Sequence, residues 1–126
     1  MADSACPEWV GRLVSLQGTV EVRRGGETEW QSAGLEDTFC FGDTIRVMEN
    51  GRAAVQLQND ALLRLDQNTT LTFSDIQNER TYIIDLLKGA VHFFSRGSKS
   101  LKVVTPYVNA AVEGTEFEVR VTDDEV

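Results

Sequence analysis

The feature that most constrains the fold is a long alternation of apolar and polar residues between positions 45 and 73. Most of the odd-numbered positions are apolar, namely Ile45, Val47, Ala53, Val55, Leu57, Ala61, Leu63, Leu65, Leu71 and Phe73. The even-numbered positions between them are mostly polar or charged. Successive side chains of a β-strand point to opposite faces. The stretch therefore predicts strands with one buried face and one solvated face, and it lacks the three- and four-residue spacing of a helix.

Turn-forming residues divide this alternation into short pieces. The sequence Glu49-Asn50-Gly51 favours a tight turn, because Asn and Gly accept positive φ angles at little cost. Positions 59–60 and 66–68 carry similar Asn and Asp residues. Upstream, a Gly-Gly turn at 25–26 separates one expected strand after Gly18 from another that ends at Trp30. Each turn ends one strand and begins the next.

Further expected strands follow in the second half of the chain. They occupy residues 81–94, 101–105, 108–112 and 116–121. The part from Tyr82 to Leu87 is apolar on both sides except for Asp85, so a short helix is the alternative there. We favour a strand, with a turn at Lys88-Gly89, because Tyr and Ile have good strand propensity. Turns recur about every ten residues, which predicts a single all-β domain of about ten short, mostly antiparallel strands. The arrangement is either a sandwich or an irregular β-solenoid-like stack.

The charge of the chain argues against binding to nucleic acid, and its hydropathy argues against a transmembrane helix in this sequence. The net charge is −8 and the arginines are scattered, whereas a nucleic-acid-binding domain presents a basic face. No apolar run approaches the ~18 residues of a transmembrane helix. Residues 1–9 are interpreted as an N-terminal tail, with a remnant left after signal-peptide removal as one hypothesis.

The two cysteines, Cys6 and Cys40, leave two interpretations open. They are either free thiols or a disulfide formed in an oxidising compartment, and pairing cannot be derived from the sequence. Lipidation of Cys6 is the weaker alternative, because Asp3 occupies the position where a bacterial lipobox has a large aliphatic residue.

Little in the sequence supports catalysis, a metal or a cofactor. The single histidine, His92, lies within an expected strand and is interpreted as a half-buried packing residue. No nucleophile elbow or phosphate-binding loop is present. The Asp and Asn residues at 66–68 and the acidic tail at 123–125 lack a calcium-loop pattern. We therefore predict no catalytic residues, no metal site and no cofactor.

Two further features have structural interpretations. In Gly42-Asp43-Thr44, the glycine permits a tight turn and the carboxylate can accept backbone hydrogen bonds. This turn-fixing role is preferred over ligand binding for Asp43. Exposed Trp9 or Trp30 could stack on a sugar or a peptide, although Trp30 is expected to close the core.

An ordered set of motifs covers nearly the whole chain from about Val10 onward. In chain order they are G-x-V-x-V at 18–22, Trp30, G-D-T-I at 42–45, L-x-R-L-x-x-N-T-x-L at 62–71, L-x-x-G-x-V-x-F at 86–93, and V-x-T-P…A-x-V-x-G-T-x-F-x-V at 103–119. The set resembles the FecR domain family, and its G-T-x-F-x-V ending is the most diagnostic part. The resemblance places a FecR-like β domain at 10–126, with a shortened C-terminal end as one interpretation.

The resemblance implies an extracytoplasmic module of the bacterial envelope, periplasmic in the regulators that name the family. Those regulators also have a cytoplasmic segment and a membrane span, which this sequence lacks, so their control of a sigma factor does not carry over simply. The expected function is a non-enzymatic binding or scaffold module of a larger envelope-associated or signal-transduction protein. It would act by contact with an unidentified protein partner. The alternative is a carbohydrate- or cell-wall-binding module whose partner is a polysaccharide.

The residues of the family motifs are expected to serve the fold. They are Gly18, Trp30, Gly42, Asp43, Thr105, Pro106, Gly114, Thr115 and Phe117. Gly114-Thr115 separates two stripes of apolar residues, where a bulge or tight bend would let one strand pass close to another. No ligand-binding residue is assigned by the sequence.

Overall fold

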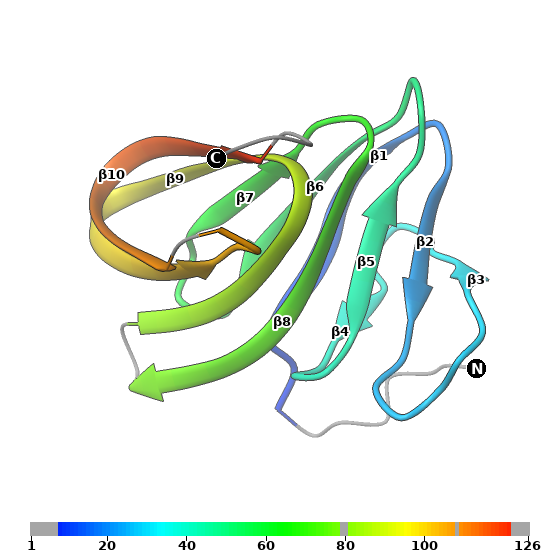
Figure 1. Cartoon of the computed structure of the whole chain (residues 1–126), viewed down its shortest axis with the longest axis horizontal. Helices are drawn as coiled ribbons and strands as arrows, with labels where there is room; N and C mark the ends of the chain where they lie inside the picture. The colour runs from blue at the N-terminus through cyan, green and yellow to red at the C-terminus, as the bar shows by residue number, and fades with distance from the viewer. Residues whose placement is uncertain (1–7, 79–80, 108, 122–126) are drawn as a thin grey trace.

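The computed structural model of the chain describes residues 8–78, 81–107 and 109–121, and the described part is all-β (Figure 1). The strands are β1 (Gly11–Gln17), β2 (Val20–Arg23), β3 (Gln31–Ser32), β4 (Thr38–Phe39), β5 (Thr44–Val47), β6 (Arg52–Leu57), β7 (Leu62–Leu65), β8 (Thr69–Asn78), β9 (Thr81–Val104) and β10 (Asn109–Val121). Every pairing between them is antiparallel. The all-β prediction, with about ten antiparallel strands, is confirmed.

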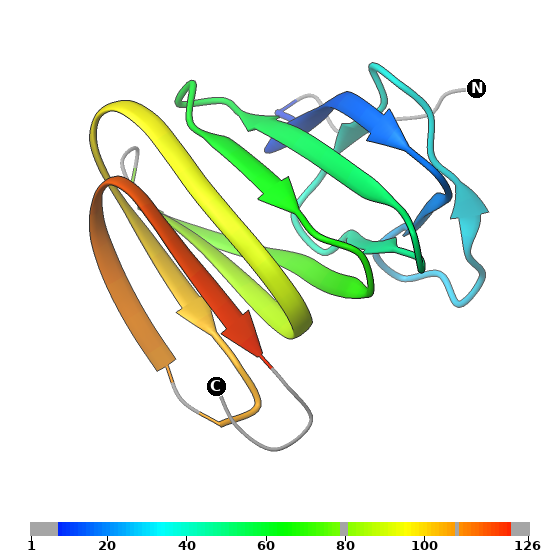
Figure 2. The ribbon, with the colours of Figure 1, turned by 90° about the horizontal axis from the view of Figure 1, so that it is seen from above.

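The strands form one sheet in the order β3-β2-β5-β8-β9-β7-β6-β1-β4, and β10 pairs with β9. Strand β9 connects the two halves of this sheet. Its first part pairs with β8, and its middle part, at Val91–Phe94, pairs with β7 on one edge and with β10 on the other. Figures 1 and 2 show β9 and β10 curling together at the end of the molecule away from β3.

The sheet folds over on itself along a line of bends, here called corners, at which the chain passes from one half of the sheet to the other. Strands β1 and β2 run along β6 and β5, which in turn run along β7 and β8. At the corners, four residues have positive φ angles, namely Gly18 (74°), Asn50 (66°), Asn68 (59°) and Gly89 (96°). Gly and Asn accept this left-handed backbone most readily. The turns predicted around Asn50 and Asn68 are thus confirmed as two of the corners.

Contacts between neighbouring corners hold the row together. The Thr69 hydroxyl is buried, accepts a hydrogen bond from Ala90 N at 3.0 Å and donates to Ala90 O at 3.2 Å. A Cβ atom placed on Gly89 would lie 2.4 Å from Thr69 Cα. The Gln67 side chain accepts a hydrogen bond from Asn50 N at 2.8 Å. Because a side chain at position 89 would collide with Thr69, only glycine there lets β9 pass so close to β8.

The folded sheet encloses one apolar core. Across β1, β6, β7, β9 and β10, inward-facing residues lie in register. One such row consists of Leu13, Val55, Leu63, Phe93 and Phe117. The two halves meet face to face, since Phe39 of β4 stacks on Phe73 of β8 with ring centroids 5.6 Å apart. Phe93 and Phe117 stack at 4.5 Å. The odd-numbered apolar residues between 45 and 73 are all buried, as the alternation predicted.

Three details differ from the sequence-based expectation. Lys88-Gly89 does not end a strand, because the backbone passes the corner at Gly89 and continues in β9 for 24 residues in all. The segments expected at 81–94 and 101–105 are therefore one strand. The strand expected to end at Trp30 is instead β3, two residues long, which begins one residue after Trp30.

Candidate functional site

The outer face of the sheet presents a row of side chains in register across five strands, and all of them except one alanine are polar. Ser15 of β1 pairs with Ala54 of β6, and Ala54 pairs with Arg64 of β7. Arg64 pairs with His92 of β9, which pairs with Glu118 of β10. Residues opposite one another in antiparallel strands are direct neighbours on one face. Side chains as far apart in sequence as Ser15 and Glu118, 103 positions, therefore lie in a single row.

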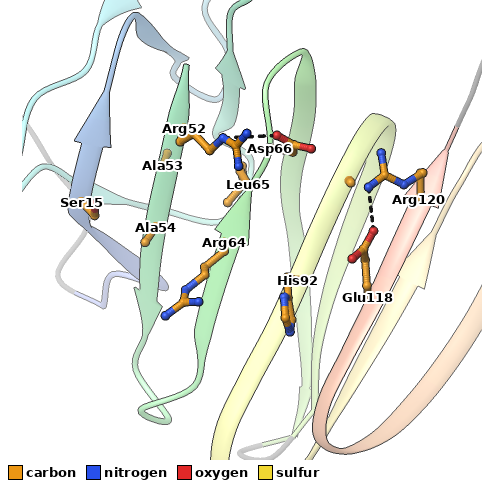
Figure 3. Close-up of a pocket in the computed structure, with 11 residues that line it drawn as sticks. Ser15, Arg52, Ala53, Ala54, Arg64, Leu65, Asp66, His92, Glu118 and Arg120 are labelled. Carbon is orange, nitrogen blue, oxygen red and sulfur yellow. Dashed lines mark hydrogen bonds and ion pairs between the residues drawn. The ribbon is translucent and has the colours of Figure 1, made fainter. Parts of the chain in front are cut away.

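A groove of about 340 Å³ opens over this row. Its other lining residues belong mainly to the adjacent row, where Arg52, Asp66, Ala90 and Arg120 lie on β6, the β7–β8 corner, β9 and β10 (Figure 3). The hollow exists because small side chains at Ala54 and Ala90 stand between long ones. The groove thus follows from the alternation of large and small residues along the outer face.

The charged groups of the groove differ in whether they have a partner. Arg52 pairs with Asp66 at 3.5 Å and Arg120 pairs with Glu118 at 2.8 Å, both drawn in Figure 3. His92 Nε2 lies 2.8 Å from a carboxylate oxygen of Glu116. Arg64 is exposed, and within the described residues its guanidinium has no hydrogen bond or ion pair.

The second feature of this region is the edge formed by β10. Among the described residues, β9 is the only strand paired with this 13-residue strand. Phe117 and Val119 point inward and pack against the core while remaining half-buried. Glu116, Glu118 and Arg120 alternate with them and are exposed. The edge therefore offers backbone hydrogen-bonding groups beside an incompletely covered part of the core.

Asp43 is a buried hydrogen-bonding centre, distant in the sheet from the groove. It is 3% exposed. Its carboxylate accepts hydrogen bonds from Gly25 N at 2.9 Å, Cys40 N at 2.8 Å and the Arg24 guanidinium at 2.8 Å. The same Arg24 nitrogen donates to the Thr38 carbonyl at 2.8 Å. Asp43 thus ties the loop after β2 to the segment before β5, which is the kind of contact expected for a turn-fixing residue.

The other family-motif residues lie at turns and strand ends. Gly18 is at a corner, and Gly42 has a φ of 99° and donates from its backbone N to Phe73 O at 2.7 Å. Thr105 and Pro106 follow β9, where the Thr105 hydroxyl accepts a hydrogen bond from Tyr107 N.

Around Gly114 and Thr115 the register of β10 shifts, which confirms the predicted bulge. The expected close approach there is wrong, since a Cβ atom on Gly114 would meet only Phe117 Cδ2, at 4.0 Å. Beyond the bulge, Phe117 and Val119 form the inward stripe that the sequence predicted.

Three sequence-based interpretations have different outcomes. Trp30 does not close the core; it is half-buried and carries the guanidinium of Arg46 at 3.8 Å from its ring centroid. His92 is half-exposed on the outer face. Cys40 is disulfide-bonded, as in one of the two interpretations left open, while Cys6 lies outside the described residues, as do most of the tail at 1–9 and the acidic residues at 123–125.

The sequence did not single out the arginines of the groove. Arg52 and Arg64 occupy even-numbered positions of the alternating stretch, and Arg120 lies in the strand expected at 116–121. These positions predict exposure and say nothing about neighbours. Within the part of the chain that the structure describes, no three acidic, Cys or His side chains are grouped to hold a metal ion. The described residues also include no helix that could cross a membrane.

The chain is an all-β module that consists of one curled antiparallel sheet, with a polar groove on its outer face and a charged edge strand. A family model described as FecR protein matches residues 43–126, two thirds of the chain. The chain belongs to the FecR family, a family associated with signalling. Strands β1 to β4 precede the matched region and are part of the same sheet. No curated protein and no solved structure matches the chain.

Proposed function

We propose that this chain is a non-enzymatic FecR-type binding module that acts by protein–protein contact. It would serve within a larger envelope-associated or signal-transduction protein, on the extracytoplasmic side of the bacterial membrane. The observation that supports this most is the edge of β10, which has no second partner strand among the described residues. An extended segment of a partner can add to such an edge as a further strand.

The chemistry of β10 suits an added strand. Backbone N–H and C=O groups at a sheet edge supply main-chain hydrogen bonds, and alternate side chains supply specificity. A strand added here would cover Phe117 and Val119, which are only half-buried. The exposed charges at Glu116, Glu118 and Arg120 would disfavour pairing with an unselected chain, as charges on natural sheet edges do.

The geometry of the groove supports a binding role over catalysis. Ser15 is its only hydroxyl and His92 its only imidazole. They lie three strands apart in one row, which at the usual spacing between strands is about 14 Å. A general base must lie within hydrogen-bond reach of the group it activates, so these two residues do not form a nucleophile–base pair.

The test is site-specific photo-crosslinking in an envelope extract, followed by hydrogen exchange with the partner that it identifies. A crosslinking residue at Glu118 on β10 is compared with one at Glu29, which is exposed in the loop before β3. We expect a protein adduct from position 118 that is absent from position 29, and slower exchange of β10 amides in the complex. Equal adducts at both positions, or unchanged exchange in β10, would contradict strand addition.

The carbohydrate alternative is tested with the same protein. Retention on insoluble peptidoglycan or polysaccharide, together with no protein adduct at position 118, would favour it. The stacked Trp30 gives this alternative little support, since one face of its ring is already covered by Arg46 at 3.8 Å.

A further inference from the structure

We propose that the groove is a binding site for a carboxylate of an acidic peptide segment, with Arg64 as the residue that receives it. This inference rests on the proposed function only in taking the partner to be a protein. It does not require strand addition at β10, because the groove spans β1 to β10 and Arg64 lies two strands away from that edge.

The first support is the unused hydrogen-bonding capacity of Arg64. A guanidinium has five N–H donors in a rigid fork that matches both oxygens of a carboxylate. The other two groove arginines already contact acids, Asp66 and Glu118. Within the described residues Arg64 has no such contact and is exposed, so its donors are available to a ligand.

The second support is the space beside Arg64. Its in-register neighbour on β6 is Ala54, and the next residue in the row is Ser15 on β1. Figure 3 shows the Arg64 side chain directed toward β6 and away from His92. A carboxylate lying over the Ala54 methyl group would have the Arg64 fork on one side and the Ser15 hydroxyl on the other.

The charges of the groove favour one carboxylate over a polyanion. Among the lining residues, Arg52, Arg64 and Arg120 contribute three positive charges, and Asp66 and Glu118 contribute two negative charges. Glu116 does not line the groove, and it contacts His92 from β10, on the opposite side of β9 from Arg64. The remaining charge of about one matches a monoanion, whereas a phosphate carries nearly two. The net charge of −8 for the whole chain would also repel a long acidic run. The fitting ligand is therefore a segment with an isolated Asp or Glu.

Apolar side chains next to Arg64 specify a second feature of the ligand. Leu62 and Phe94 lie in register two residues along β7 and β9, on the same outer face as Arg64 and His92. Phe94 is 46% exposed, which is unusual for a large aromatic side chain. An apolar residue close to the acidic one in the ligand would cover Phe94. The site thus fits an extended peptide in which an acidic residue lies close to an apolar one.

The experiment titrates the chain with the capped peptide acetyl-Glu-Ala-Leu-Ala-amide, followed by amide NMR shifts and calorimetry. The matched ligand replaces Glu with Gln. We expect saturable shifts at Ala54 and Arg64 for the Glu peptide, and at least about tenfold weaker binding for the Gln peptide and for Arg64→Gln. Removing one charged hydrogen-bonding partner usually has an effect of this size. The control Arg96→Gln removes an exposed arginine outside the groove and should change the affinity less than twofold.

Several results would overturn the proposal. Unchanged affinity in Arg64→Gln, or equal loss in Arg96→Gln, would show that the contact is not at Arg64 or is only general charge attraction. Saturable binding of inorganic phosphate or glucuronate without binding of the peptide would assign the groove to another class of ligand. These readouts are separate from hydrogen exchange in β10, so failure of the groove site and failure of strand addition can be told apart.

Discussion

Replacing Asp43 with alanine tests whether one buried carboxylate holds the loop after β2 against the segment before β5. The Asp43 side chain is 4% exposed and that of Arg24 is 21% exposed. The carboxylate accepts three hydrogen bonds, all 2.9 Å or shorter. Asp43→Ala removes both acceptor oxygens, and with them all three bonds, and leaves the Arg24 guanidinium with the Thr38 carbonyl and the ring of Phe39.

The expected loss follows from those contacts. Hydrogen bonds to charged groups contribute about 1.5–3 kcal/mol each, and breaking a buried ion pair costs about 3–5 kcal/mol. Gly25 is exposed, so water can replace its bond, and Arg24 is partly solvated. We therefore expect Asp43→Ala to lower the free energy of unfolding by about 3 kcal/mol. For a chain of this length, that corresponds to a fall in Tm of roughly 10 °C.

The assay is equilibrium unfolding in urea, followed by circular dichroism and by tryptophan fluorescence so that two-state behaviour is checked. The matched control is Asp37→Ala, because Asp37 is half-buried and its carboxylate accepts one bond, from Gly34 N at 2.8 Å. We expect about 1 kcal/mol for the control. A loss below about 1 kcal/mol for Asp43→Ala, or one equal to the control, would show that the Asp43 carboxylate does not hold these two segments together.

Two further predictions concern the corner of β9 and the edge of the core. Gly89→Ala should destabilise the protein by about 3 kcal/mol or more, because its Cβ would overlap Thr69 and the backbone has a φ of 96°. The control Gly97→Ala, with nothing within 4 Å, should change stability by less than about 0.5 kcal/mol in the same urea unfolding assay. Equal effects of the two substitutions would contradict the close approach of β9 to Thr69. Burial raises the pKa of the Tyr82 phenol above 10.0, although hydrogen bonding with the backbone at Asn59 and Gln58 partly opposes this. The unfolded chain then releases this proton first, so stability should fall as pH rises above about 10; the fall should be smaller in Tyr82→Phe, and parallel curves would refute it.

The buried face was the part of the structure that the sequence predicted best. The apolar positions from Ile45 to Phe73 are buried because a strand alternates strictly and one face must leave water. The turns at Asn50 and Asn68 were predicted for a similarly local reason, since few residues accept positive φ. The hydrogen-bonding role of Asp43 is local only in part, because Cys40 is close in sequence whereas Gly25 and Arg24 are not.

The features that the sequence missed depend on pairing between distant strands. Lys88-Gly89 has the composition of a turn, yet β9 continues through it because Thr69 and Ala90 bind each other across the corner. Trp30 is a large aromatic residue of the kind expected in a core, but it lies just before β3, is half-buried and contacts the guanidinium of Arg46 on β5, two strands away from β3 in the sheet. Neither outcome can be derived from residues adjacent in the chain.

From the sequence alone one can predict which side chains leave water, where the chain can turn, and that the product is an antiparallel β domain with the motifs of the FecR family. These depend on backbone geometry and hydrophobicity over a few residues. The pairing of distant strands brings Ser15, Ala54, Arg64, His92 and Glu118 into one row and leaves β10 at an edge, and neither feature follows from local sequence. The physical reason is register: shifting any one of these strands by a single residue would turn its side chains to the other face, and the groove would not form.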